Sequence, residues 1–180
     1  MPVFDTGQTV MAGAAHAGNQ SGSVDIGDDV TGKSLVFNNG SSHYLTKTPS
    51  GAGDKMTWTI SLWLKRSTTG VSHMLWDHGT THGTNTFTDL YFGSDDTITF
   101  YHYTGSTVGN FQTTRKFRDT SAWYHIHFVC DTTNASADKR ARLYINGVEE
   151  TSFASTTNMP IRTETYMNGT GEQRIGEYMG

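Results

Sequence analysis

The chain has 180 residues, enough for one domain with a buried core, and 12% of them are aromatic. Its net charge is −4 and no basic cluster appears, which argues against a nucleic-acid partner. Cys130 is the only cysteine, which excludes an intrachain disulfide and a zinc site built from several cysteines. We recognise neither an apolar stretch long enough to span a membrane nor a secretory signal, and we expect no membrane insertion.

Residues 1–32 are predicted to form an extended N-terminal arm outside the folded domain. Residues 11–18 are small, residues 22–32 are acidic and rich in glycine, and neither segment has a useful helical or strand period. We expect the arm to stay mobile or to become ordered against another protein. The globular domain is predicted to span residues 33–180.

From residue 33 onward the chain reads as a series of short β-strands, and no window predicts an amphipathic helix. The clearest alternation, at residues 58–65, leaves Trp63 on the outer face, where its indole needs a cover of its own. The same alternation directs four residues to a core: Trp58, Ile60, Leu62 and Leu64. Further strands are predicted at residues 34–37, 43–45, 74–76, 87–92, 97–103, 123–131 and 142–148, the last with a tight turn at Asn146 and Gly147. This pattern predicts an all-β fold, an antiparallel two-sheet β-sandwich of the jelly-roll type.

Five sequence blocks occur in a fixed order: residues 34–37 (SLVF), 43–45 (HYL), 58–66 (WTISLWLKR), 117–126 (FRDTSAWYHI) and 143–148 (LYINGV). In these blocks the chain resembles a laminin-G-like domain of the concanavalin A-like lectin/glucanase superfamily, over about residues 33–178. More narrowly, it looks like the versions found in bacteriophage virion proteins such as tail fibres, spikes and head-associated proteins. The resemblance implies a concanavalin A-like jelly roll. It leaves function open, because this fold hosts lectins, hydrolases, lyases and structural modules.

The ends of the chain suggest partners. Family members usually continue past the position of Ile175 and Gly176 into a final strand, whereas this sequence stops at Gly180. We therefore expect a sandwich without its final strand, whose open sheet edge pairs with another chain. The resemblance also implies that residues 1–32 attach the module to a virion. The expected partners are other virion proteins, further copies of the chain in a homo-oligomer, and a host surface glycan.

A polysaccharide-degrading enzyme is the enzymatic alternative on this fold. Hydrolases of the superfamily often place their two carboxyl groups as Glu-x-Asp-x-x-Glu on one strand. That motif is absent, because all five glutamates lie at position 149 or later and none has an aspartate two residues after it. His125 and His127 suit a transition metal or a lyase base, but a structural role on a sheet face is favoured, and Cys130 is read as a core residue. We expect no enzyme activity and name no catalytic residue.

A glycan site would combine an aromatic platform with directional polar groups, since a pyranose has an apolar face and a rim of hydroxyls. A loop rich in hydrogen-bonding groups, residues 77–85, follows a tryptophan, and two tyrosines form a stripe on one predicted sheet face. The candidate carbohydrate-binding residues are Trp76, Asp77, His78, His82, Asn85, Tyr101 and Tyr103. The candidate cofactor is calcium, with Asp77 as its candidate ligand. The alternative for the tyrosine stripe is a surface covered by a loop or subunit.

Together, the residues and the resemblance predict a non-enzymatic, virion-associated lectin-like module of a tail fibre, spike or head decoration. It would be made in the host cytoplasm, act on the phage particle, bind glycans and attach the particle to its host. Single sugar sites bind weakly, and the many copies on a virion would supply the affinity. A purely structural capsid or tail component is the first alternative, and the polysaccharide-degrading enzyme is the second.

Overall fold

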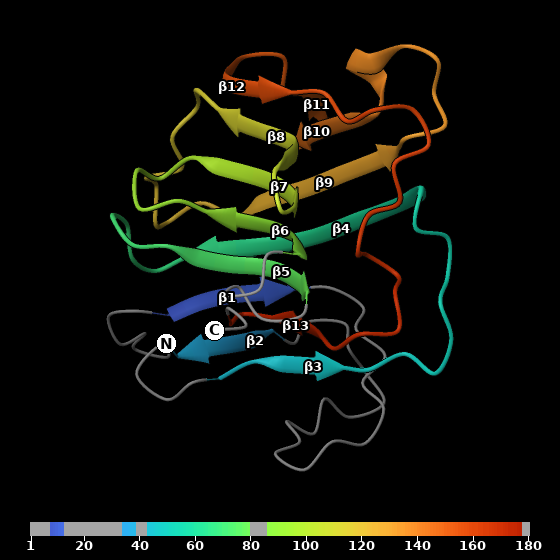
Figure 1. The fold of residues 1–180 in the computed structure, drawn as a ribbon. Coiled ribbons are helices and arrows are strands. Elements are labelled where there is room, and N and C mark those ends of the chain that lie inside the picture. Colours follow the sequence, from blue (N-terminus) through green and yellow to red (C-terminus); the bar gives the residue numbers. More distant parts are fainter. Residues whose placement is uncertain (1–7, 13–33, 39–42, 80–85, 178–180) are drawn as a thin grey trace.

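Two β-sheets form the molecule (Figure 1). The computed structural model describes residues 8–12, 34–38, 43–79 and 86–177, with the backbone alone for residues 8–12 and Asn38. In these residues the regular structure is thirteen strands and one short 3₁₀ helix, η2 (Ala137–Lys139). No helix in the described part of the chain is long and apolar enough to cross a membrane.

The sheets contain six and seven strands, and every pairing is antiparallel. The six-stranded sheet has the order β11 (Val148–Glu149), β10 (Ala141–Ile145), β9 (Tyr124–Asp131), β4 (Thr57–Arg66), β1 (Gln8–Ala12) and β2 (Leu35–Asn38). The seven-stranded sheet has the order β12 (Phe153–Thr157), β8 (Thr107–Thr113), β7 (Ile98–Thr104), β6 (Thr86–Phe92), β5 (His73–Gly79), β13 (Gln173–Ile175) and β3 (Leu45–Lys47). The prediction of an all-β, antiparallel two-sheet sandwich is confirmed.

Strand β1 comes from the segment predicted to be an arm. It lies between β2 and β4, with Val10 opposite both Val36 and Lys65. Five residues of the predicted arm are therefore part of the sandwich, in contrast to the expectation that all of residues 1–32 lie outside it. The backbone N–H and C=O groups of these residues form hydrogen bonds with β2 on one side and β4 on the other. Without β1, the facing sides of β2 and β4 would lack these partners. The rest of the predicted arm falls outside the described residues.

The C-terminal segment is also paired. Strand β13 lies between β5 and β3, so Gln173 and Arg174 have a neighbour on each side, and Ile175 pairs with Leu45 of β3. The edges of the two sheets are instead formed by β11, β2, β12 and β3. The expected pairing of an open edge with another chain stays a prediction.

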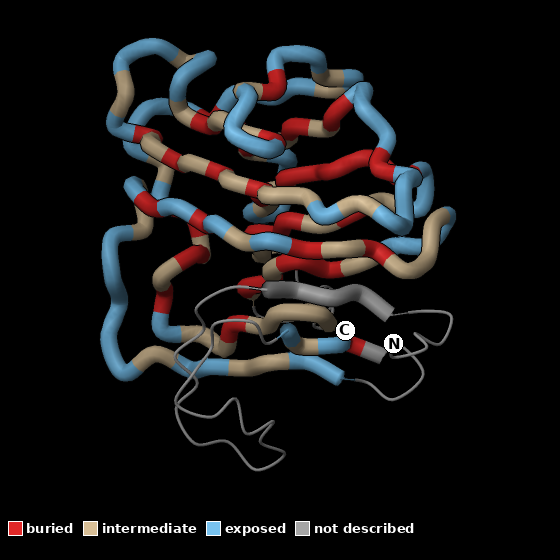
Figure 2. The backbone as a smooth tube through the Cα atoms, turned by 180° about the vertical axis from the view of Figure 1, so that it is seen from behind, coloured by how far each residue is buried: buried red, intermediate tan, exposed pale blue. Residues whose placement is uncertain are grey.

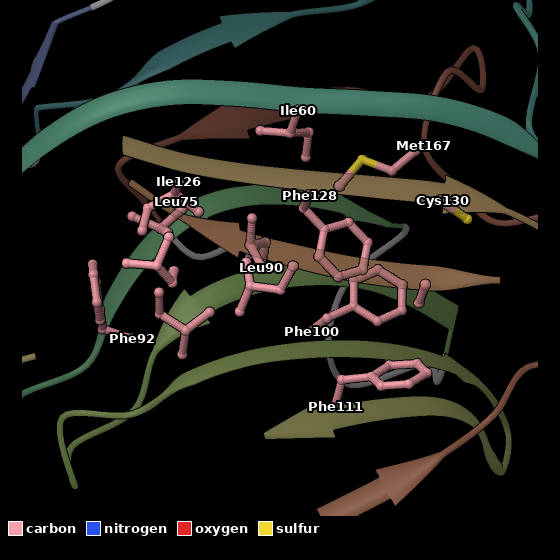
Figure 3. Close-up of a cluster of buried hydrophobic side chains, with 14 of the residues drawn as sticks. Ile60, Leu75, Leu90, Phe92, Phe100, Phe111, Ile126, Phe128, Cys130 and Met167 are labelled. Carbon is pink, nitrogen blue, oxygen red and sulfur yellow. The ribbon is translucent and has the colours of Figure 1, made fainter. Parts of the chain in front are cut away.

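The core lies between the sheets and is rich in aromatic rings (Figure 3). Phe100 of β7 stacks on Phe128 of β9, with 4.5 Å between ring centroids, and Trp58 of β4 stacks on the same ring at 5.6 Å. The backbone tube shows how buried residues alternate with exposed ones along the strands (Figure 2). Cys130 is 1% exposed, and burial raises the pKa of its thiol to about 12, as befits a core residue.

A buried ion pair ties the two sheets together at one end. Arg66, the last residue of β4, is fully buried, and its Nη1 lies 3.1 Å from the carboxylate of Asp96. Nη1 also donates a hydrogen bond to the carbonyl of Phe117 at 2.8 Å. Asp96 occupies the tight turn between β6 and β7, where its φ is +70°. Arg66 therefore joins a strand of the six-stranded sheet to a hairpin of the seven-stranded sheet.

Candidate functional site

Strand register places a row of polar and aromatic residues on the outer face of the seven-stranded sheet. Asp77 of β5 lies opposite Asp89 of β6, which lies opposite Tyr101 of β7, which lies opposite Asn110 of β8. Directly paired residues share a face of a sheet, and alternate residues point to the other face. Because the neighbouring Leu90–Phe100 pair is buried in the core, the Asp77 row must point outward.

Three aromatic rings gather beside this row. Phe87 stacks on Tyr103 with 5.4 Å between centroids and 17° between the ring planes, and it lies 5.5 Å from Tyr101. The two tyrosine rings are 5.9 Å apart, and the Tyr101 hydroxyl is hydrogen-bonded to that of Thr107 at 2.8 Å. We call Phe87, Tyr101 and Tyr103 the front patch. All three are half-buried, so their rings are neither core residues nor freely exposed.

The two aspartates of the row are shielded from solvent, with 0% of Asp77 and 2% of Asp89 exposed. Burial, together with the charge of Asp77 and a hydrogen bond with its carboxyl, raises the pKa of Asp89 to about 9. At neutral pH Asp89 therefore keeps its proton, which can form the hydrogen bond between the carboxyls. The two buried carboxyl groups beside the front patch therefore do not carry two full negative charges.

The other described candidate residues in and next to the predicted loop do not lie on this outer face. Trp76 is half-buried and packs against the core, opposite Leu90. His78 is 3% exposed and follows Asp77, so it points to the inner face and away from the front patch. His82 and Asn85 lie outside the described residues. Among the predicted residues that the structure describes, the outer face therefore brings together Asp77, Tyr101 and Tyr103 only.

His78 is held by the loop that precedes β13. Its Nδ1 donates a hydrogen bond to the carbonyl of Glu172 at 2.7 Å, and its ring meets Tyr166 edge-on at 6.4 Å. A Cβ added to Gly169 or Gly171 would lie only 2.8 Å or 2.7 Å from the His78 ring. His78 is therefore a packing residue whose ring requires glycine at positions 169 and 171. It lies on the inner face of the sheet, out of reach of a ligand on the outer face.

A metal site is not evident in the described residues, where no three His, Cys, Asp or Glu side chains come together. Asp77 has one carboxyl neighbour, Asp89, whose pKa favours the protonated form. Calcium requires six or more oxygen ligands, and protonated carboxyls are poor ligands for it. Calcium at Asp77 stays a prediction.

The arrangement of the described carboxyl groups can be compared with that of a glycosidase. Glycosidases need carboxyls about 5 Å apart or more, on either side of the scissile bond, whereas Asp77 and Asp89 are in hydrogen-bond contact. Four of the glutamates instead form ion pairs: Glu150 with Arg115, Glu164 with Lys55, and Glu172 and Glu177 with Arg174. The Asp77–Asp89 pair therefore does not match the carboxyl arrangement of a glycosidase.

Sequence reasoning missed Phe87, Asp89 and Asn110. The signal for the first two was available, because strands were predicted at residues 87–92 and 97–103, with only a short turn between them. The observed register pairs Phe92 with Ile98, which carries Asp89 to Tyr101 and Phe87 to Tyr103. Counting back from the turn would have placed both residues beside the tyrosines. Asn110 had no such signal, because no strand was predicted at residues 107–113.

The sequence matches a family model described as "Concanavalin A-like lectin/glucanases superfamily" over residues 38–178. The chain belongs to this superfamily. The resemblance seen in the sequence blocks is thus confirmed at the level of the family. No curated protein matches the chain.

Similar solved structures share the fold at low sequence identity. A heptameric SAP-like pentraxin from Limulus polyphemus has 17% identity and a TM-score of 0.47, and the match covers 74% of this chain and 57% of the pentraxin chain. The CBM40 domain of a Ruminococcus gnavus IT-sialidase, bound to α2,6-sialyllactose, has 14% identity and a TM-score of 0.43, covering 69% and 78%. The same domain with α2,3-sialyllactose has 16% identity and a TM-score of 0.42, covering 69% and 77%. This chain spans little more than half of the pentraxin, and none of these likenesses bears on its ligand.

Proposed function

We propose that this chain is a non-enzymatic carbohydrate-binding module whose glycan site is the front patch. The observation behind the proposal is the convergence of Phe87, Tyr101 and Tyr103 on one sheet face beside the polar Asp77 row. Aromatic rings offer their faces to the apolar side of a pyranose, and neighbouring polar groups bind its hydroxyls.

The polar groups around the front patch suit this task. The Tyr101 and Thr107 hydroxyls are hydrogen-bonded to each other, and the Asn110 amide donates to the Ser155 hydroxyl at 2.9 Å. Each of these groups keeps further hydrogen-bonding capacity for a sugar hydroxyl. Because the groups belong to strands of one sheet, their positions are set before a ligand arrives, which lowers the entropic cost of binding.

We further propose that the module acts on a virion, in a tail fibre, spike or head decoration, and attaches the particle to glycans of its host. This part rests on the resemblance of the sequence blocks to phage virion proteins. Many copies on a symmetric particle would convert weak single sites into firm attachment. An antibody raised against the chain should label intact particles in electron microscopy, and particles without label would contradict this placement.

The binding proposal is tested on a glycan array, followed by titration of the best glycan. The double variant Tyr101→Ala/Tyr103→Ala should bind at least about tenfold more weakly, because it removes two of the three rings. Tyr44→Ala is the matched control: it removes a 40%-exposed ring that packs under Arg174 near β3 and should bind as the wild type does. An array without hits, or a double variant with unchanged affinity, would contradict the proposal and favour the structural alternative.

A further inference from the structure

A row of rings crosses the outer face of the six-stranded sheet, on the side of the sandwich away from the front patch. Trp63 of β4 stacks on His125 of β9, with 5.0 Å between centroids and 18° between planes. His127 follows at 6.1 Å from His125, and it meets Tyr144 of β10 edge-on at 5.7 Å. We call these four residues the back ladder. It runs across three neighbouring strands, β4, β9 and β10 (Figure 1).

The back ladder is fixed in place by register and by hydrogen bonds. Trp63 lies directly opposite His125, and His127 lies directly opposite Tyr144. The Ser61 hydroxyl is hydrogen-bonded to Nε2 of His125 at 2.9 Å, and Arg142 donates to the Tyr144 hydroxyl at 3.1 Å. A ligand would therefore meet rings that are already oriented, on strands rather than on a loop.

The exposed ring of this ladder is not explained by the core. Trp63 is 47% exposed, although its stack on His125 covers part of the indole. Trp58, five residues earlier on the same strand, is 8% exposed and donates its indole N–H to Thr165 at 2.8 Å. An isolated exposed apolar residue needs no explanation, but an exposed indole at the end of an ordered row of rings forms a binding platform.

We propose that the back ladder is a second carbohydrate-binding surface, specific for neutral saccharides. Trp63 supplies the stacking face for a pyranose, and the histidines and Tyr144 supply hydrogen-bonding edges along the row. This inference goes beyond the proposed function, because it concerns the opposite sheet and shares no residue with the front patch.

The choice of a neutral sugar follows from the composition of the face. Lys65 and Arg142 lie on the ladder side of their strands, and the opposite charge is supplied by Glu149 of β11, which lies opposite Tyr144. No single charge dominates, so an acidic polysaccharide gains little. Polar groups separate the rings of the ladder, and their hydrogen-bonding atoms suit the hydroxyls of a sugar.

The test is affinity gel electrophoresis of the whole chain in gels that contain one polysaccharide each. The neutral probes are hydroxyethyl cellulose, glucomannan, mixed-linkage β-glucan and dextran, and the acidic probe is polygalacturonate. At least one neutral probe should retard the wild type, and Trp63→Ala should bind that probe at least about tenfold more weakly. Trp63→Phe keeps a ring and should recover part of the retardation. Thermal melts of each variant confirm that the fold persists.

Two comparisons separate this proposal from the first. The control Tyr44→Ala removes an exposed ring next to β3 of the other sheet and should be retarded as the wild type is. If Tyr101→Ala/Tyr103→Ala loses all retardation while Trp63→Ala keeps it, the front patch is the site and the back ladder is not. Equal retardation of the wild type and Trp63→Ala in every neutral gel overturns the proposal. So does a wild type that dimerises in analytical ultracentrifugation while Trp63→Ala stays monomeric, because the ladder is then a contact between copies.

Discussion

The two outer faces of the sandwich carry aromatic rings in different surroundings. The front patch lies beside two aspartates that are shielded from solvent and share a hydrogen bond. The back ladder ends in Trp63, which is 47% exposed, and its neighbours are histidine, serine and tyrosine. Strand alternation produces both rows, and in the first of them burial raises the pKa of Asp89. The comparison teaches that ring clusters made by the same strand alternation can differ in the polar groups beside them and in their exposure to solvent.

The largest expected effect concerns Asp89. Its pKa of about 9 lies above the ordinary value of an aspartate, so the folded state keeps a proton that the unfolded state loses above about pH 4. The stability of the wild type should therefore fall as pH rises from about 4 to 9. Asp89→Asn can still donate to Asp77 and removes this loss, so at pH 8 it should be more stable by a few kcal/mol. Urea unfolding at pH 4 and pH 8 measures the difference.

A control for this prediction is Asp138→Asn, which removes an exposed carboxylate in η2. Its effect should stay within about 0.5 kcal/mol at both pH values. If Asp89→Asn is no more stable than the wild type at pH 8, or gains as much stability at pH 4 as at pH 8, then Asp77 and Asp89 do not share a proton.

The next effect comes from a histidine on the inner side of the same sheet. His102 is fully buried against Thr88, and burial lowers its pKa to about 4. The unfolded state binds a proton below about pH 6.5 and the folded state does not, so stability should fall as pH drops from 6.5 to 4. His102→Gln should reduce this acid loss by about 2 kcal/mol, since glutamine does not titrate. Melting temperatures across that range, compared with the wild type, test it. An unchanged acid slope would contradict the assignment.

Particular residues show how far the sequence predicts this molecule. The alternation at residues 58–65 correctly separated Trp58, Ile60 and Leu64 from Trp63, because a period of two depends only on local geometry. The placement of Gln8–Ala12 could not be predicted, since pairing with β2 and β4 depends on partners far along the chain.

The candidate site was predicted in part for the same reason. Tyr101 and Tyr103 share a face by alternation, and the structure places them on one face. His78 was grouped with Asp77 because the two are neighbours in sequence, yet successive residues on a strand point to opposite faces. Asp77 meets Asp89 only through register between strands. Local pattern thus predicts faces, and tertiary pairing decides which residues meet.

Removing a ring of the front patch should lower the free energy of unfolding by a smaller amount. Tyr103→Ala removes a ring that stacks on Phe87 and lies 5.9 Å from Tyr101. Aromatic pairs of this geometry contribute about 0.5–1.5 kcal/mol beyond their buried area, so the variant should lose about 1–2 kcal/mol. Chemical denaturation at pH 7 measures the loss. Tyr103→Phe keeps the stack and should stay close to the wild type.

The smallest effect is expected from the back ladder. Trp63→Ala removes one cross-strand stack from a solvent-facing position, and such pairs contribute about 0.2–1 kcal/mol. The variant should therefore lose less than about 1 kcal/mol in the same denaturation assay. A loss of stability of about 3 kcal/mol or more would mean that Trp63 is needed for folding. The back ladder would then stabilise the protein at least as much as the front patch does.

The buried ion pair between Arg66 and Asp96 resists sliding of one sheet over the other. A ligand held on one outer face pulls on one sheet, and sheets that touch only through apolar side chains can slide past each other under such a load. Arg66 is the last residue of β4. It pairs with Asp96 in the turn between β6 and β7, and it donates a hydrogen bond to the carbonyl of Phe117 in the segment after β8. A sideways pull on either face therefore strains a desolvated ion pair as well as the packing between the sheets. Pulling experiments on single molecules should find the wild type stiffer than Arg66→Met at equal extension.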